Sequence, residues 1–132
     1  MYNYFWIAVG SGLGGIARYW CSGIAARTIG ETFPWGTLIV NVVGSCIIGF
    51  FATVTGPDGR VFVSTTTRQF VMVGFCGGYT TFSSFSLQTL NLVNDGEWTY
   101  AVTNSAASVF ACLLAVWIGH VAAVGLNALK WV

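Results

Sequence analysis

Four long apolar segments, joined by short polar connections, constrain this chain more than any other feature. They cover residues 3–26, 33–55, 69–93 and 98–129. Each is at least as long as the roughly 20 residues that an α-helix needs to cross a bilayer. Only 7% of the 132 residues are charged, whereas a soluble domain carries about 25%. We therefore expect an all-α integral membrane protein, with a single transmembrane domain of four helices over residues 1–132.

The connections and their charges bear on how the chain sits in the membrane. Gly56-Pro57-Asp58-Gly59 and Asn94-Asp95-Gly96-Glu97 are typical of turns, and four passes leave both termini on one side. That side carries three basic residues and the other side two, namely Arg60, Arg68 and Lys130 against Arg27 and Arg18. Because Lys and Arg set orientation, this near balance permits insertion both ways up and hence an antiparallel dimer. No basic region precedes the first segment, so we expect no cleaved signal peptide.

Residues 74–86 interrupt the third segment where a lipid-spanning helix would be uniformly apolar. This run contains three glycines and several hydroxyl side chains. We expect a break from Gly77 to Thr80, because the Gly77-Gly78 pair weakens a helix. Any backbone group that the break frees must find a partner inside the protein, because hydrocarbon offers none. Broken membrane helices can offer carbonyl groups to a cation such as sodium, and Gly77 and Thr80 are the best-placed donors. A kink or a close-packed patch without a ligand is the alternative.

Phe82 and Phe85 follow the glycines, and their spacing of three places both rings on one helical face. The edge of a phenyl ring is electropositive, so a small, hard anion could approach it. Ser83, Ser84 and Ser86 add hydroxyl donors beside the rings. The alternative is an ordinary pair of packed core rings, which is the commoner use of this spacing.

The first two segments each contain one strongly polar side chain. Asn41 could join helices by hydrogen bonds or point its amide N–H groups at an anion. Arg18 could extend to the membrane interface, as long basic side chains often do, or supply a cation beside an anion path. In the same first segment, Gly10-x-x-x-Gly14 and Ser11-x-x-x-Gly15 have the small-residue spacing that predicts a close helix crossing.

Several classes of function are excluded by the rest of the sequence. The net charge of +1 leaves no basic surface for nucleic acid. No arrangement typical of an enzyme is present, and the acidic residues all fall in or beside the connections: Glu31, Asp58, Asp95 and Glu97. The four cysteines match no metal-ligand spacing, so we expect buried, apolar thiols. We expect His120 to have a structural or interfacial role and Trp131 to lie at a membrane interface.

The run at 74–86 resembles the third-helix signature of the Fluc/CrcB fluoride channels, roughly G-F-x-G-G-x-T-T-F-S-T-F. The similarity extends to Gly14-Gly15-x-x-Arg18, and to Trp35-Gly36-Thr37-Leu38 followed by Asn41. The resemblance implies a fluoride-selective channel that exports fluoride passively across the inner (plasma) membrane of a microbial cell. It also implies a dual-topology, antiparallel homodimer in the lipid bilayer, with two pores, a broken third helix and a central structural sodium ion.

The resemblance further implies roles for individual residues. Phe82 and Phe85 match the phenylalanines that line the fluoride pathway, and Asn41 matches a pore asparagine. Gly77 and Thr80 match the carbonyl donors for the sodium ion. The remaining matches are the hydroxyl groups of Ser83, Ser84 and Ser108 in the fluoride pathway, and Arg18 at the vestibule.

The chain departs from the family pattern at three positions. Ser84 stands where threonine is usual and keeps the hydroxyl group. Gln88 stands where many members have glutamate, which puts in doubt any role for a carboxylate at the pore mouth. Tyr79 is bulkier than the usual aliphatic residue.

Two other functions are alternatives to a fluoride channel. A small dual-topology multidrug exporter also has four helices, but it needs a carboxylate within the membrane for proton coupling, and the first segment has none. A helical membrane scaffold without a transport role would leave the phenylalanine pair and the neighbouring hydroxyl groups without a purpose.

Overall fold

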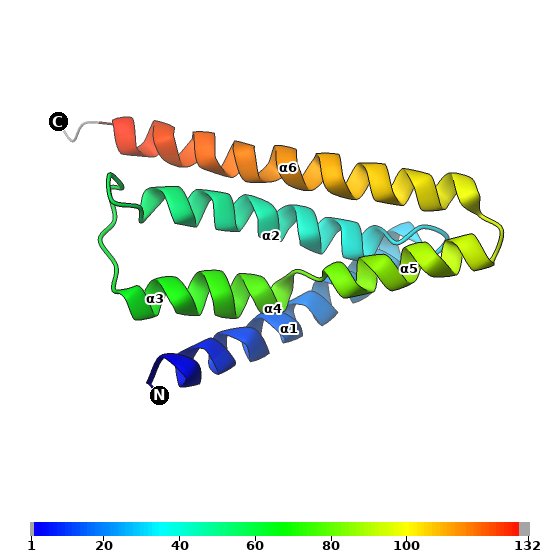
Figure 1. The fold of residues 1–132 in the computed structure, drawn as a ribbon, viewed down its shortest axis with the longest axis horizontal. Coiled ribbons are helices and arrows are strands. Elements are labelled where there is room, and N and C mark those ends of the chain that lie inside the picture. The colour runs from blue at the N-terminus through cyan, green and yellow to red at the C-terminus, as the bar shows by residue number, and fades with distance from the viewer. Residues whose placement is uncertain (1, 130–132) are drawn as a thin grey trace.

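The computed structural model describes residues 2–129. This part of the chain forms four helical passes that run along the long axis of the molecule (Figure 1). Three passes are single helices: α1 (Tyr2–Ile29), α2 (Trp35–Val54) and α6 (Trp98–Ala128). The third pass is assembled from α3 (Thr65–Gln69), the π-helix η1 (Phe70–Cys76), α4 (Gly77–Tyr79) and α5 (Phe82–Asn94). Successive passes alternate in direction, so the start of α1 and the end of α6 lie at the same end. The predicted all-helical layout of four passes is confirmed, and Lys130 and Trp131 lie outside the described residues.

The exposed surface of the described residues is that of a helical membrane protein. Two helices, α2 and α6, are long and apolar enough to cross a membrane. Large apolar side chains also project outward along the passes, where a soluble protein would expose few contiguous ones. Examples are Leu13, Ile16, Phe110, Leu113 and Trp117, all of them at least half exposed.

Two helix ends differ from those expected, and local features of the chain explain both. The first helix continues beyond residue 26 to Ile29 and stops at Gly30, whose φ of 110° is one that other residues rarely adopt. The third pass begins at Thr65, earlier than expected, because the Ser64 hydroxyl accepts a hydrogen bond from Thr67 N at 3.1 Å. Serine is a preferred residue at a helix N-terminus for this reason.

A glycine crossing holds α1 against η1 and α4. A Cβ atom added at Gly10 would lie 3.1 Å from Gly74 Cα, and one added at Gly14 would lie 2.8 Å from Tyr79 N. Only glycine permits backbones to approach so closely, so the predicted Gly10-x-x-x-Gly14 crossing is confirmed. In the Ser11-x-x-x-Gly15 pattern only Ser11 takes part in the crossing, because no described residue lies within 4 Å of a Cβ added at Gly15. The crossing fixes α1 beside the last helical turn before the third pass is interrupted.

The α2 and α6 helices lie side by side along their length (Figure 1). Near their C-terminal ends, Gly49 faces the α6 backbone and Gly119 faces the α2 backbone at distances that leave no room for a side chain. His120 Nδ1 lies 2.8 Å from Thr53 Oγ1 and joins the same two helices. The structural role expected for His120 is therefore confirmed.

Arginines secure the helix ends nearest to the chain termini. Arg68 Nη1 donates hydrogen bonds of 2.6 Å to both the carbonyl oxygen and the hydroxyl oxygen of Thr55, just after α2. Arg60 Nη1 donates to the carbonyl oxygen of Leu126, near the end of α6, at 2.9 Å. The last carbonyl groups of a helix lack partners within it. The two arginines supply such partners and thereby hold the connection between α2 and α3 in place.

Candidate ion site at the helix interruption

Thr80 and Thr81 interrupt the third pass with extended backbone. Their φ and ψ angles are −81° and 158°, and −152° and 107°, between the helical residues of α4 and α5. Of the break expected from Gly77 to Thr80, only Thr80 is extended: Gly77, Gly78 and Tyr79 are helical, and the interruption lies one residue further along the chain than expected. Gly78 instead meets a packing need, because a Cβ added there would lie 2.8 Å from Ser11 Cα on α1.

Asn41 of α2 braces this interruption with a reciprocal pair of hydrogen bonds. Its Nδ2 donates to Thr81 O at 3.1 Å, and Thr81 N donates to Asn41 Oδ1 at 2.7 Å. In an unbroken helix Thr81 N would donate to Gly77 O, so the brace replaces that bond. Of the two alternatives for Asn41, joining helices is confirmed. The amide group carries a second N–H, so donation to an anion stays a prediction.

Thr81 directly precedes α5 and caps its N-terminus. The sequence analysis gave this residue no role. Its Oγ1 accepts a hydrogen bond from Ser84 N at 3.1 Å and donates one to Ser84 Oγ at 2.9 Å. Ser83 Oγ lies 3.3 Å from the same oxygen. The hydroxyl groups of both serines are therefore engaged with Thr81. The missed signal was a threonine directly before a helical run, since threonine favours that position.

A groove of about 430 Å³ opens beside the interruption, between α2, the third pass and α6. Most of its lining is apolar, including Ile48, Met72 and Leu113. It collects most of the predicted site residues: Asn41, Gly77, Thr80, Phe82, Phe85 and Ser108. Ser83, Ser84 and Arg18 are not among the described residues that line it. The structure thus brings together residues from four separate elements in one low-dielectric groove, where electrostatic interactions are strong.

The two phenylalanines lie as their spacing predicted. Their ring centroids are 5.1 Å apart with 47° between the planes, and both rings line the groove, so the shared face is confirmed. Phe85 is half-buried, whereas Phe82 is 76% exposed. The contact of the ring edges with an anion stays a prediction.

Arg18 reaches into the molecule at the interruption. Its Nη1 donates to Thr80 O at 3.4 Å. In an unbroken helix Ser84 N would donate to that oxygen, but here Ser84 N donates to Thr81 Oγ1. Arg18 therefore has a partner at the interruption, and both interpretations of this residue, extension to the membrane interface and a cation beside an anion path, stay predictions.

The chemistry of the interruption fits a hard cation held by main-chain carbonyl groups. Within residues 2–129, no group of three His, Cys, Asp or Glu side chains could hold a metal ion. The four cysteines are free thiols, and only Cys76 is fully buried, so the expectation of buried thiols holds for that residue alone. Gly77 and Thr80 each offer a carbonyl oxygen that has lost its helical donor to Asn41 or Thr81. Carbonyl groups at an unwound helix end are typical sodium ligands.

A buried line of polar side chains leads from the groove between α5 and α6. Asn104 is 1% exposed, and its Nδ2 donates to Thr89 Oγ1 at 2.8 Å. Ser108 Oγ donates to Asn104 Oδ1 at 3.5 Å, and Thr89 Oγ1 donates to Phe85 O at 2.8 Å. Sequence reasoning assigned Ser108 to the site but left out Asn104 and Thr89. The missed signal was the spacing of four between Asn104 and Ser108, which places both on one helical face.

The carboxylates lie away from the groove. Glu31, Asp95 and Glu97 line a separate hollow of about 460 Å³, together with Gln88. Asp58 lies in the turn after α2, so all four acidic residues are in connections, as expected. No carboxylate of this chain therefore lies on a helix at the interruption.

Comparisons with known proteins identify the family. A sequence profile described as CrcB-like protein, Camphor Resistance (CrcB), matches residues 5–120. A protein of Opitutus terrae named "Fluoride-specific ion channel FluC" is 62% identical over 127 residues, which are 96% of each chain. Proteins with the same name are 58% identical in Rhodospirillum rubrum, over 95% of this chain and 97% of that one, and 57% identical in Methylocella silvestris, over 97% and 98%. The matched residues include the glycine crossing, the Asn41 brace and the whole groove, and this chain belongs to the CrcB-like protein family.

Proposed function

We propose that the chain is the subunit of a fluoride-specific ion channel and is not an enzyme. Relatives that match it over nearly their whole length are named as fluoride-specific channels. The observation that carries the proposal is the groove at the helix interruption. There Asn41, Ser108 and the two phenylalanines meet within apolar walls.

Conduction through this groove requires that fluoride exchange its water for donors on the protein. Asn41 offers its second amide N–H, and Ser108 offers a hydroxyl group. Phe82 and Phe85 offer the positive edges of their rings. Because the described helices carry no carboxylate that could couple the movement to protons, fluoride is proposed to move passively down its gradient. Ser83 and Ser84 are also proposed to belong to the pathway: both hydroxyl groups bond to Thr81 and hold the start of α5, and Ser84, which accepts its bond from Thr81, keeps its own O–H to donate.

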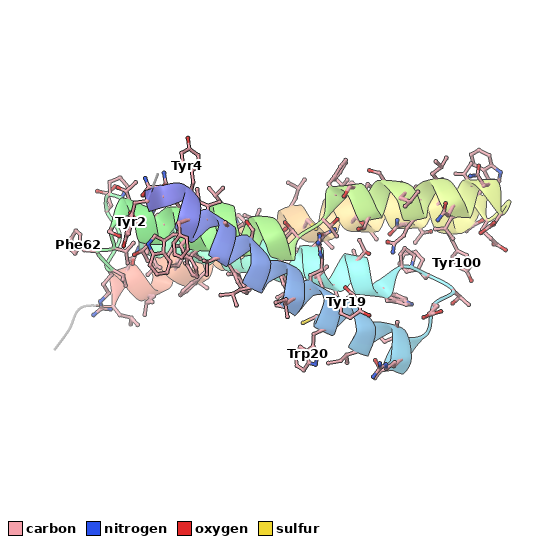
Figure 2. The ribbon with its side chains drawn as sticks, turned by 90° about the horizontal axis from the view of Figure 1, so that it is seen from below. Tyr2, Tyr4, Tyr19, Trp20, Phe62 and Tyr100 are labelled. Atoms are coloured by element: carbon pink, nitrogen blue, oxygen red, sulfur yellow. The ribbon has the colours of Figure 1, made fainter. Side chains whose placement is uncertain are left out.

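The four passes are proposed to span the inner (plasma) membrane, with the interruption at membrane depth. The positions of aromatic side chains support this placement of the passes across the membrane, because such side chains favour the two membrane–water interfaces. Figure 2 shows Tyr2, Tyr4 and Phe62 together at the end where α1 begins, while Tyr100 lies toward the opposite end. The side-chain brace from Asn41 supplies the partners that extended backbone needs at that depth.

The functional unit is proposed to be an antiparallel homodimer with two pores. In a single chain the groove is open, and Phe82, Val109 and Leu113 along its lining are more than half exposed. A second copy, inserted the other way up, would cover these side chains and complete the wall of the pathway. The near balance of basic residues between the two ends permits both orientations.

A structural sodium ion is proposed at the centre of this dimer. Each chain supplies the carbonyl oxygens of Gly77 and Thr80, and a two-fold axis would bring the same pair from the second copy. Sodium bound there would supply a fixed positive charge between the two pathways. Arg18 adds its own positive charge at the Thr80 carbonyl, where it raises the local attraction for an anion.

Anion efflux from liposomes tests the proposed function. Vesicles containing the purified chain are loaded with fluoride or with chloride, and release is followed with ion-selective electrodes. We expect rapid fluoride release and little chloride release, with protein-free vesicles as the control. Equal release of the two anions would refute a fluoride-specific channel. Proton-coupled drug uptake would instead favour the multidrug exporter, although the helices of this chain carry no carboxylate of the kind that such coupling requires.

A further inference from the structure

Gly44 is a buried residue of α2 that lines the groove one turn after Asn41, and the proposed function assigns it no role. A Cβ atom added there would overlap Thr80 Cγ2 and would lie 3.2 Å from Tyr79 Cδ1. Thr80 is the first extended residue of the interruption between α4 and α5 (Figure 1). The α2 helix therefore contacts two consecutive residues of the interruption: Asn41 bonds to the main chain of Thr81, and Gly44 receives the side chain of Thr80.

A hydrogen bond fixes the direction of the Thr80 side chain. Its Oγ1 donates to Cys76 O at 2.9 Å, and Thr80 N donates to the same oxygen at 2.9 Å. The hydroxyl and methyl groups of a threonine share one Cβ and turn together. Turning the methyl group away from Gly44 would therefore take the hydroxyl group off its acceptor, and hydrocarbon offers no other partner. A side chain at residue 44 would accordingly displace the main chain of Thr80.

The main chain of Thr80 carries one of the carbonyl groups proposed to hold sodium. A metal site tolerates a change of only about 0.2 Å in its ligand distances. Relief of the overlap between a Cβ at Gly44 and Thr80 Cγ2 needs a larger displacement than that. The empty space at Gly44 therefore bears directly on where the Thr80 carbonyl oxygen lies.

We propose that Gly44 is a positioning residue for the sodium site, because the space that it leaves on α2 receives the Thr80 methyl group and thereby fixes the Thr80 carbonyl group. The inference rests on the proposed function, since the position of this carbonyl group matters only if it holds sodium. Glycine at residue 44 then serves sodium binding as well as helix packing. Gly49 of the same helix faces α6 and serves packing alone.

Moving one methyl group across this contact tests the role. Gly44→Ala adds a methyl group that overlaps Thr80 Cγ2, whereas Thr80→Ser removes Cγ2 and keeps the hydroxyl group that bonds to Cys76. In the double variant the nearest atom of residue 80 is its Cβ, which would lie 3.8 Å from the new methyl group, an ordinary contact distance. The double variant therefore contains as many methyl groups as the parent protein and lacks the overlap.

Sodium affinity is read from the thermal stability of the purified protein, titrated with sodium chloride and balanced with choline chloride at constant ionic strength. For Gly44→Ala we expect the sodium concentration at half-maximal stabilisation to rise at least about fivefold, the scale of overpacking, because sodium must draw the carbonyl group back against the overlap. In the Thr80→Ser background the same change should raise it less than about twofold. Gly49→Ala is the matched structural control, since its Cβ would overlap the Val116 carbonyl oxygen. We expect it to lower stability and leave the sodium midpoint unchanged.

The possible results separate this inference from the proposed function. With a parent protein that responds to sodium, an unchanged midpoint in Gly44→Ala, an equal rise in both backgrounds, or a rise in Gly49→Ala would each overturn the inference and leave the proposed function intact. If Gly44→Ala alone does not fold, a folded double variant with the sodium midpoint of Thr80→Ser supports the inference, and a double variant that also fails to fold overturns it. A parent protein whose stability does not depend on sodium would refute the sodium site and this inference together, while fluoride efflux from liposomes would still decide the proposed channel.

Discussion

Replacing Asn41 with leucine would remove both hydrogen bonds that hold the main chain of Thr81 while keeping the approximate size of the side chain. Hydrogen bonds between membrane helices contribute about 0.6 to 1.7 kcal/mol each, so the pair stabilises the interruption by roughly 1–3 kcal/mol. Each 1.4 kcal/mol is a factor of ten in an equilibrium constant, so the constant that favours the braced state would fall by roughly five- to 150-fold. If conduction needs the brace, fluoride efflux falls, by at most that factor.

Two measurements check this prediction. Fluoride efflux from liposomes gives the loss of conduction, and hydrogen–deuterium exchange at the Thr81 amide reports the loss of its partner. Asn94→Leu is the matched control, since that asparagine is exposed at the end of α5. In Asn41→Leu we expect faster exchange at Thr81 together with slower efflux. Unchanged exchange would refute the brace, and undiminished efflux would refute its importance for conduction.

Asn41→Asp separates bracing from contact with the anion. The carboxylate can still accept the hydrogen bond from Thr81 N, but it cannot donate to Thr81 O and it repels fluoride. We expect the Thr81 amide to stay protected while efflux falls. Efflux equal to that of the parent protein would show that Asn41 does not face the anion path.

Three further predictions address the pathway, the cation and the helix crossing. Replacing Phe82 and Phe85 together with isoleucine should abolish fluoride flux and leave a dimer, because the electropositive ring edges are lost; undiminished flux in a well-folded dimer would sink the ring-edge proposal. Complete removal of sodium should lower the thermal stability of the dimer or its flux, and if both stayed the same the carbonyl site would be rejected. Gly14→Leu should prevent the α1 crossing and destabilise the protein by at least about 2 kcal/mol, the scale of overpacking, as measured by thermal unfolding, whereas Gly12→Leu faces open space and should change it little.

Much of the fold was predictable because composition leaves few choices. An apolar chain with few charges, and with all its acidic residues in short connections, must satisfy its backbone within helices, and four segments of spanning length then give four passes. The small-residue spacing at Gly10 and Gly14 likewise predicted a crossing that the structure confirms. The sequence did not reveal that Gly15 would face open space, because spacing alone does not say on which face a partner helix lies.

The candidate site was predictable as a set of residues but not as an arrangement. Phe82 and Phe85 share a face because their spacing is local, and sequence was sufficient for that. Ser83 and Ser84 were expected in the pathway, yet their hydroxyl groups turn back to Thr81. A hydroxyl group takes whichever partner the folded chain brings near, and the sequence does not rank those partners.

The third pass shows most clearly which features the sequence determines and which depend on tertiary contacts. Composition and residue type dictate that residues 74–86 cannot form an ordinary lipid-spanning helix. They do not dictate that Gly77 and Gly78 stay helical, with the backbone of α1 packed against Gly78. Nor do they place the interruption at Thr80 and Thr81, where an amide group 40 residues earlier in the chain supplies the partners that the broken helix has lost. Backbone groups within a membrane must be satisfied by something, and which residue satisfies them depends on how the helices assemble.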